Sequence, residues 1–204
     1  MIIHGHSDSQ GLERVLRVDK STNSLQTIEY AHHEIHSGSS FSAHYSLTTA
    51  STDDHRTGIG FTTPAGLKWP HMTIEVTASA PAELFFLEGP TLDADPGTNV
   101  VVYNRNRNSD NEATIGSLEA TPTANEITTL TEAQIGAATF SGGTELEYML
   151  LAGGGGPKAV GGSARGSQEW ILQPSTKYMI YLQNVGANAN THVIHIDWYE
   201  HTNN

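Results

Sequence analysis

The sequence predicts an all-β protein, an antiparallel jelly-roll-like sandwich that follows an irregular N-terminal arm. Short apolar runs recur about every 8 to 12 residues, which is typical of an antiparallel sandwich or barrel. Several runs alternate apolar and polar residues with a period of two, and no helical pattern alternates with them, so a βαβ architecture is not expected. Charged residues make up 16% of the chain, while Gly, Thr, Ser and Asn are abundant, as in short strands joined by turns.

The chain is expected to hold one β domain and one arm. Its 204 residues are enough for a single domain with a sizeable core and too few for two full domains. Residues 1–27 are mostly polar and are read as the arm. Residues 28–204 carry the regular apolar runs and are read as the sandwich.

Two segments carry the strongest strand patterns. In Trp69–Ala78 every second residue is apolar from Met72 onward, and in His192–His201 Ile194, Ile196 and Trp198 alternate with polar residues. A period of two places the apolar residues on one face of a strand and the polar ones on the other. Each segment is therefore predicted to be a strand with one buried and one solvated face.

Other segments lack this alternation. Ala82–Glu88 is apolar on both faces, so it should be buried on both sides or lie against another subunit. Asn99–Tyr103 is interpreted as a central strand of the sandwich, because its short apolar run does not alternate. Gly153–Gly166 contains too little side chain to form a core and is predicted to be a long loop.

The overall charge argues against binding to nucleic acid or to an anionic membrane. There are 10 basic and 22 acidic residues, which give a formal net charge of −12. The absence of cysteine excludes disulfides and thiolate metal sites, and no apolar run is long enough to span a bilayer. The first residues lack the pattern of a signal peptide, so folding in a cytoplasm is expected, with oligomerisation as a source of stability.

The densest group of possible ligands lies in Ile28–Phe41, at the start of the predicted sandwich. If this stretch is extended, His32, Glu34 and His36 share one face and His33 points the other way. Zinc or nickel could accept such a set, but the spacing differs from helical zinc motifs, and no metal or other cofactor is expected. The preferred interpretation is a contact with another protein chain through His32, His33, Glu34 and His36.

No catalytic motif is recognised in the sequence. The glycine-rich segment lacks the order and the following helix of a phosphate-binding P-loop, and no nucleophile elbow is present. Paired carboxylates for glycoside cleavage remain an open alternative, with Glu75, Glu83 and Glu88 as candidates. Exposed aromatic rings could instead bind a sugar, but the three tryptophans lie in apolar strand patterns and are predicted to be in the core: Trp69, Trp170 and Trp198.

Three segments resemble a family of tailed-bacteriophage virion proteins: Gln26–Gly38 (QTIEYAHHEIHSG), Gly161–Leu172 (GGSARGSQEWIL) and Asp197–His201 (DWYEH). Members of this family accompany major capsid proteins and are usually treated as head decoration, cement or head-fibre components. The resemblance implies a β-rich, often trimeric protein on the outside of the capsid, assembled in the host cytoplasm. It supplies no catalytic residues.

The leading expectation is therefore a non-enzymatic capsid decoration or cement protein that forms a homotrimer and binds the major capsid protein. Repeated weak contacts over a trimer would give avidity. One alternative is a receptor- or glycan-binding head-fibre or tail module, and a second is a jelly-roll enzyme that degrades glycans. A solvent-facing ring beside polar groups would favour the sugar-binding alternative, and two facing carboxylates in a cleft would favour the enzyme.

Overall fold

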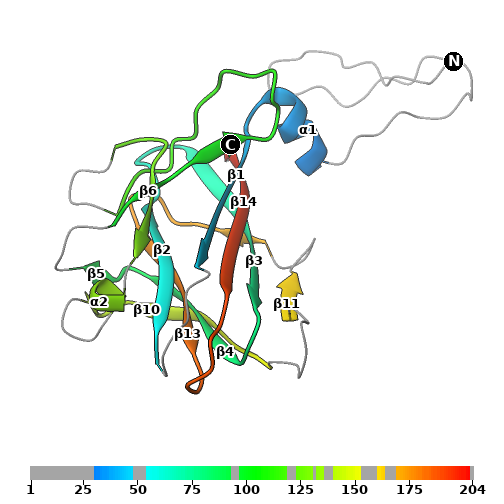
Figure 1. Ribbon diagram of the computed structural model, residues 1–204. Coiled ribbons are helices and arrows are strands. Elements are labelled where there is room, and N and C mark those ends of the chain that lie inside the picture. Colours follow the sequence, from blue (N-terminus) through cyan, green and yellow to red (C-terminus); the bar gives the residue numbers. More distant parts are fainter. Residues whose placement is uncertain are drawn as a thin grey trace, which may run out of the picture. The chain divides into compact units, whose positions relative to one another are not determined.

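The computed structural model describes residues 30–47, 54–92, 97–118, 123–130, 132–135, 140–152, 160–163 and 169–202. The predicted arm, residues 1–27, lies outside the described residues. The chain divides into two units, Met1–His33 and Glu34–Asn204. The second unit is an antiparallel β-sandwich, which confirms the predicted fold class (Figure 1).

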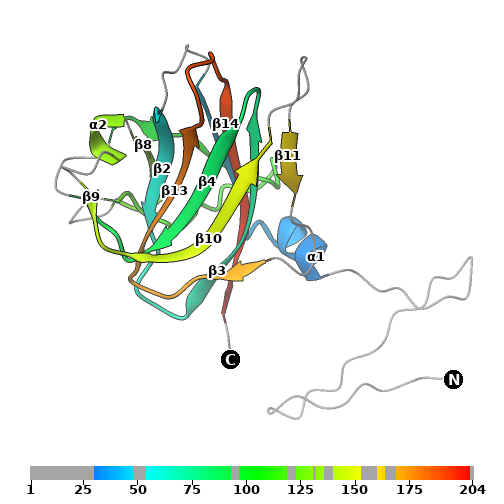
Figure 2. The same ribbon diagram turned by 90° about the horizontal axis from the view of Figure 1, so that it is seen from below.

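Two sheets make up the sandwich. The strand order of sheet 1 is β11-β3-β14-β1-β7, with β12 also paired to β3, and the order of sheet 2 is β10-β4-β13-β2-β8-β6. Figure 2 shows β2, β13, β4 and β10 side by side in one layer. The strands of sheet 1 are β1 (Ser40–Leu47), β3 (Lys68–Ala78), β7 (Val102–Asn104), β11 (Val160–Ser163), β12 (Trp170–Ile171) and β14 (His192–Thr202). Those of sheet 2 are β2 (Arg56–Thr62), β4 (Ala82–Glu88), β6 (Asn99–Val100), β8 (Ile127–Leu130), β10 (Thr144–Leu151) and β13 (Lys177–Asn184).

The remaining elements are short. Helix α1 (Tyr30–Ser37) precedes β1, helix α2 (Glu132–Ile135) follows β8, and β5 (Thr91–Leu92) pairs with β9 (Phe140–Ser141). Eight strands form the body of the two layers. Strands β1, β3, β11 and β14 belong to sheet 1, and β2, β4, β10 and β13 belong to sheet 2. Segments far apart in sequence are therefore neighbours in each sheet.

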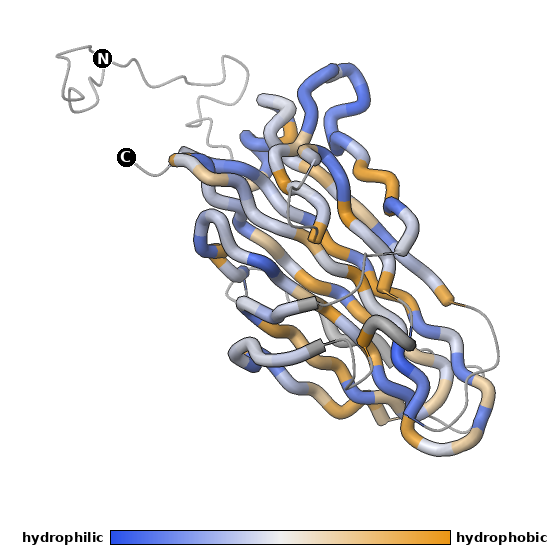
Figure 3. The backbone as a smooth tube through the Cα atoms, turned by 90° about the vertical axis from the view of Figure 1, so that its left-hand side faces the viewer, coloured by the Kyte–Doolittle hydropathy of each residue, from blue (hydrophilic) through white to orange (hydrophobic). Residues whose placement is uncertain are grey.

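The main core lies between the sheets and follows the predicted alternation. Figure 3 shows hydrophobic residues recurring between hydrophilic ones along the strands. On β14 the buried apolar side chains are Ile194, Ile196 and Trp198, as predicted, and on β3 they include Met72, Ile74 and Val76. Phe86 packs against Trp170 with ring centroids 5.7 Å apart. Of the three tryptophans predicted to be in the core, Trp198 is fully buried and Trp170 is partly buried against the core. The prediction is wrong for Trp69, which is half-buried and belongs to neither core cluster.

A second, smaller core covers part of the outer face of sheet 2. It contains Leu87, Leu118, Leu130, Ile135, Met179 and Tyr181. Gly60 makes this packing possible, because a β-carbon there would lie only 2.5 Å from the Leu118 side chain. Leu84 and Phe86 face the main core, and Leu87 on the other face enters the second one. Glu83 and Phe85 on that other face are only partly buried, so the predicted cover on both sides of Ala82–Glu88, by the protein itself or by another subunit, is found within the chain only in part.

A loop and a strand were also predicted wrongly. Val160–Ser163, inside the predicted glycine-rich loop, forms β11 and pairs with β3, because backbone groups can pair at a sheet edge whatever the side chains. Asn99–Tyr103 is not a central strand. It splits into β6 at the edge of sheet 2 and β7 at the edge of sheet 1, with Val101 between them.

Candidate functional site

Helix α1 carries the four predicted contact residues, so the extended conformation considered for this stretch does not occur. At about 100° per residue on a helix, His32 and His36 share one face while Glu34 lies roughly opposite. His32, His33 and His36 are exposed, but only 6% of Glu34 is exposed. The trio therefore does not converge, and no group of three or more His, Asp or Glu residues able to hold a metal ion occurs among the described residues.

Gly38 ends α1 and is the local signal that predicts a helix here. Its φ of 76° is in the left-handed region, its N–H donates to the carbonyl of Ile35 at 3.1 Å, and the N–H of Ser39 donates to the carbonyl of Glu34 at 3.0 Å. This pair of bonds is a Schellman motif, which commonly closes a helix at glycine. The His-rich stretch followed by Gly38 is thus the end of a helix.

Replacing Gly38 by alanine is expected to reduce the free energy of unfolding by about 2 kcal/mol. A positive φ costs an alanine about 1 kcal/mol, and its β-carbon would also collide with the side chain of Ser109. Gly89→Ala is the matched control, because Gly89 has a φ of 68° but open space around the added β-carbon. If urea unfolding shows the same loss of unfolding free energy for both variants, the collision with Ser109 does not contribute to the destabilisation.

The outer face of sheet 1 gathers four histidines, which we call the histidine face: His44, His71, His195 and His201. They come from β1, β3 and β14, and each lies on the side of its strand away from the main core. The sequence pattern had placed His195 on the solvated side of its strand. The meeting of the four depends on the antiparallel register, in which His44 lies opposite His195 and His71 opposite Tyr199.

Ser42, His195 and Asp197 form a connected group on the histidine face. The Oγ of Ser42 lies 3.0 Å from the Nε2 of His195, and the same Nε2 lies 3.3 Å from Oδ1 of Asp197. In a serine-nucleophile relay the two contacts use different ring nitrogens, so that the carboxylate orients the ring while Nε2 takes the proton. With both contacts on Nε2, this group is a hydrogen-bonded cluster and does not have the geometry of a relay.

The cluster favours a protonated His195. The hydrogen bond to Asp197 raises the pKa of His195 above its ordinary value, against the opposing effect of burial. Burial alone would raise the pKa of Asp197, but the hydrogen bond with His195 and the charge of Arg105 outweigh it and lower that pKa. Arg105 Nη1 lies 3.8 Å from Asp197 Oδ2. The group is thus an ion network on the sheet surface.

A second group on the histidine face surrounds His71. Its ring stacks on Tyr199 with centroids 4.7 Å apart, its Nδ1 lies 3.2 Å from Oε1 of Glu169, and His201 meets it edge-on at 6.1 Å. Burial lowers the pKa of His71, although the charge of Glu169 opposes that change. The contacts of His71, like those of His195, resemble pairs that stabilise a sheet surface more than they resemble a catalytic arrangement.

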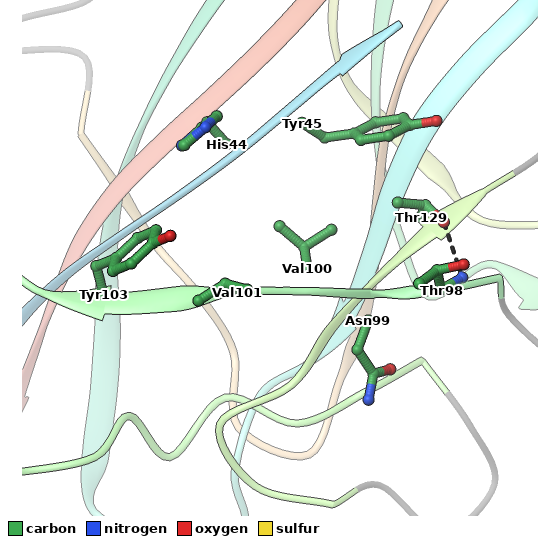
Figure 4. Close-up of a pocket in the computed structure, with 8 residues that line it drawn as sticks. All are labelled: His44, Tyr45, Thr98, Asn99, Val100, Val101, Tyr103 and Thr129. Atoms are coloured by element: carbon green, nitrogen blue, oxygen red, sulfur yellow. Dashed lines mark hydrogen bonds between the residues drawn. The ribbon is translucent and has the colours of Figure 1, made fainter.

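A pocket of about 360 Å³ opens where the edges of the two sheets meet (Figure 4). It lies along the β6–β7 segment that had been interpreted as a central strand. Side chains from β1 and β8 complete its walls. The lining residues are His44, Tyr45, Thr98, Asn99, Val100, Val101, Tyr103 and Thr129.

The predicted carboxylates are not brought together. Glu83 and Glu88 project from opposite faces of β4: Glu83 accepts a hydrogen bond from the Tyr148 hydroxyl at 2.7 Å, and Glu88 accepts one from Tyr178 at 2.8 Å. Glu75 belongs to β3 in the other sheet and lies opposite His195. These three residues therefore do not form the facing pair that glycoside cleavage requires.

None of the helices among the described residues is long and apolar enough to cross a membrane. Comparisons with models of protein families, with curated proteins and with solved structures find no match for this chain.

Proposed function

We propose that the protein is a non-enzymatic structural protein of a bacteriophage virion, which decorates and stabilises the outside of the capsid as a homotrimer. Its partners are the major capsid protein and other copies of itself. The resemblance in Gln26–Gly38, Gly161–Leu172 and Asp197–His201 suggests this role. The separate positions of Glu75, Glu83 and Glu88 and the shared Nε2 contacts of His195 agree with a non-enzymatic function.

The strand order supports a jelly roll. Within sheet 1 the order β1-β14-β3-β11, facing β2-β13-β4-β10 in sheet 2, is the order produced when an antiparallel ribbon of eight strands folds over into two Greek keys. Short strands β6, β7, β8 and β12 extend or supplement these eight. A rigid sandwich of this kind can present several independent contact surfaces at its edges and faces.

The observation that carries the proposal is an apolar surface on the outer face of sheet 2, which we call the aromatic row: Tyr148, Phe85 and Leu150. The Phe85 ring stacks on Tyr181 with centroids 4.7 Å apart and meets Tyr148 edge-on at 5.3 Å. Tyr148 is 49% exposed and Leu150 is 61% exposed. Tyr148 is also held by its 2.7 Å hydrogen bond to Glu83, so the surface is ordered before any partner binds.

An ordered apolar surface of this kind is suited to protein association. Tyrosine and other aromatic residues are enriched in interfaces, where a fixed ring loses little conformational freedom on binding. Two residues of the aromatic row, Tyr148 and Leu150, belong to β10. In the described part of the chain β10 is an edge strand of sheet 2, and an edge strand has backbone groups that can pair with another strand. We assign the aromatic row to the contact between subunits.

Helix α1 remains the candidate for contact with the capsid. His32, His33 and His36 have exposed side chains there. Glu34 does not belong to that surface, because its side chain is buried.

Attachment to capsids tests the proposed role directly. Purified protein mixed with capsids that lack it is expected to sediment with them, up to a saturating ratio fixed by the capsid lattice. Bovine serum albumin, which is also acidic, serves as the control for non-specific trapping. Protein that stays in the supernatant, or that sediments without saturation, would contradict a role in decoration.

A further inference from the structure

The β6–β7 segment exposes apolar side chains that the packing of the sandwich does not require. Val100 points into the main core, but Val101 is 62% exposed and Tyr103 is 43% exposed. Both border the pocket between the sheet edges, which has a volume of about 360 Å³. A concave site of a few hundred cubic ångströms lined by apolar and a few polar groups is the usual form of a small-molecule site.

The Tyr103 ring is held in place before any ligand binds. The ring of His44 lies nearly parallel to it, with centroids 6.5 Å apart and an angle of 13° between the planes. The guanidinium carbon of Arg107 lies 5.6 Å from the Tyr103 centroid, at cation–π distance. A ring fixed from two directions can offer its remaining surface to a ligand at little cost in conformational entropy.

Hydroxyl groups gather at the other end of the pocket. Figure 4 shows Tyr103 and His44 at one end and Tyr45, Thr98 and Thr129 at the other. The Oγ1 of Thr129 accepts a hydrogen bond from the N–H of Thr98 at 2.9 Å, so its own proton can be donated to a ligand oxygen. The pocket thus combines an apolar, aromatic end with an end that can donate and accept hydrogen bonds.

The lining contains no group with a permanent charge. Its eight residues include no Lys, Arg, Asp or Glu, and the charges nearby are already engaged: Arg107 lies over Tyr103, and Glu126 accepts a hydrogen bond from the Asn99 amide at 3.0 Å. Phosphate or carboxylate ligands need fixed cationic donors. The lining therefore favours a neutral ligand.

We propose that this pocket binds a neutral hexopyranose unit of an oligosaccharide. One face of a pyranose ring carries aliphatic C–H groups, which are attracted to the electron-rich face of an aromatic ring, while its edge carries hydroxyls. Tyr103 and Val101 would contact the C–H face, and Tyr45, Thr98 and Thr129 would bond the hydroxyls. A virion surface protein with such a site could adhere to bacterial surface polysaccharide, a function separate from capsid attachment.

Binding can be measured by NMR on the full chain labelled with ¹⁵N. The probes are maltose, cellobiose, lactose and N,N′-diacetylchitobiose, with glucuronic acid and inorganic phosphate as charged comparisons. At least one neutral disaccharide is expected to bind with a Kd of about 10 mM or tighter and to shift the amide signals of residues 98–103 and 129. Binding of phosphate or glucuronic acid in preference to every neutral sugar would overturn the proposal.

Variants of Tyr103 distinguish the loss of ring stacking on the ligand from damage to the fold. Tyr103→Ala is expected to weaken binding by at least about tenfold, whereas Tyr103→Phe keeps the ring and most of the affinity. Ile171→Ala is the control, because Ile171 is exposed and apolar but belongs neither to the pocket lining nor to the aromatic row, and it should leave binding unchanged. Equal affinity for Tyr103→Ala and the parent protein, with native spectra for both, would also overturn the proposal, as would the absence of binding by all four disaccharides.

Discussion

Lowering the pH from about 6.5 to about 4 is expected to reduce the free energy of unfolding by about 3 kcal/mol through His192. Burial lowers the pKa of this side chain from 6.5 to about 4, and the charge of His55 adds to the effect. His192 is 1% exposed. Its Nδ1 lies 3.2 Å from the hydroxyl of Thr57, and its Nε2 has no hydrogen-bond partner within the described ranges of the chain.

The loss of stability at low pH follows from proton uptake by the unfolded chain. Between pH 6.5 and pH 4 the unfolded state binds a proton at this position and the folded state does not, so stability is present above pH 6.5 and declines toward pH 4. His195, whose pKa is raised, acts in another range: its contribution is complete below its ordinary pKa and is lost at higher pH. It therefore does not offset the effect of His192.

Urea unfolding at pH 7 and pH 4 measures this contribution. His192→Gln removes the titrating group while keeping a polar side chain near Thr57, so the variant should lose about 3 kcal/mol less than the parent between the two pH values. Identical pH dependence for His192→Gln and the parent would rule out His192 as a source of acid sensitivity.

Polar substitutions in the aromatic row are expected to weaken self-association by roughly 100-fold or more. Burying an exposed leucine or tyrosine contributes on the order of 1.5–3 kcal/mol, and Tyr148→Ser with Leu150→Ser removes two such side chains from each subunit. Because both residues are exposed in the single chain, the variant should retain its fold.

Sedimentation equilibrium of the parent and the double variant tests this assignment. The parent should be a trimer at micromolar concentration and the variant mainly a monomer. Leu67→Ser with Ile171→Ser is the control, since both residues are exposed and apolar but lie outside the aromatic row. A monomeric parent would exclude self-association. A control variant that dissociates as readily as the Tyr148 and Leu150 variant would show that the aromatic row is not the specific interface.

Strands with a strong alternation of apolar and polar residues could be predicted from sequence, because the order of neighbouring residues determines which side chains are buried. In β14 each second residue is apolar, and Ile194, Ile196 and Trp198 are buried as the period of two requires. The same pattern predicted the buried side of β3. Ala82–Glu88 was also predictable in part, because a strand that is apolar on both sides needs a cover on both sides.

Other features depended on signals that compete. The two-residue spacing of His32, Glu34 and His36 fits one face of a strand, but Gly38 favours a helix end. The Schellman bonds at Gly38 close a helix here. Asn99–Tyr103 is as apolar as a central strand, yet it crosses from one sheet to the other. Composition alone cannot distinguish a buried apolar run from one that lines a pocket.

The candidate surfaces were not predictable, because they combine residues from distant parts of the chain. Ser42 meets Asp197 only through the pairing of β1 with β14, and Tyr148 meets Phe85 only through the pairing of β10 with β4. Pairing partners of this kind are set by topology and register, which single-sequence patterns do not contain.

Cryo-electron microscopy of the intact phage particle tests the proposed function most directly. The proposal predicts density for the β-sandwich on the outside of the capsid, at regular lattice positions, in groups of three with the aromatic row between neighbouring copies. A particle that lacks this protein, or that carries it only on the tail, would contradict a role in capsid decoration.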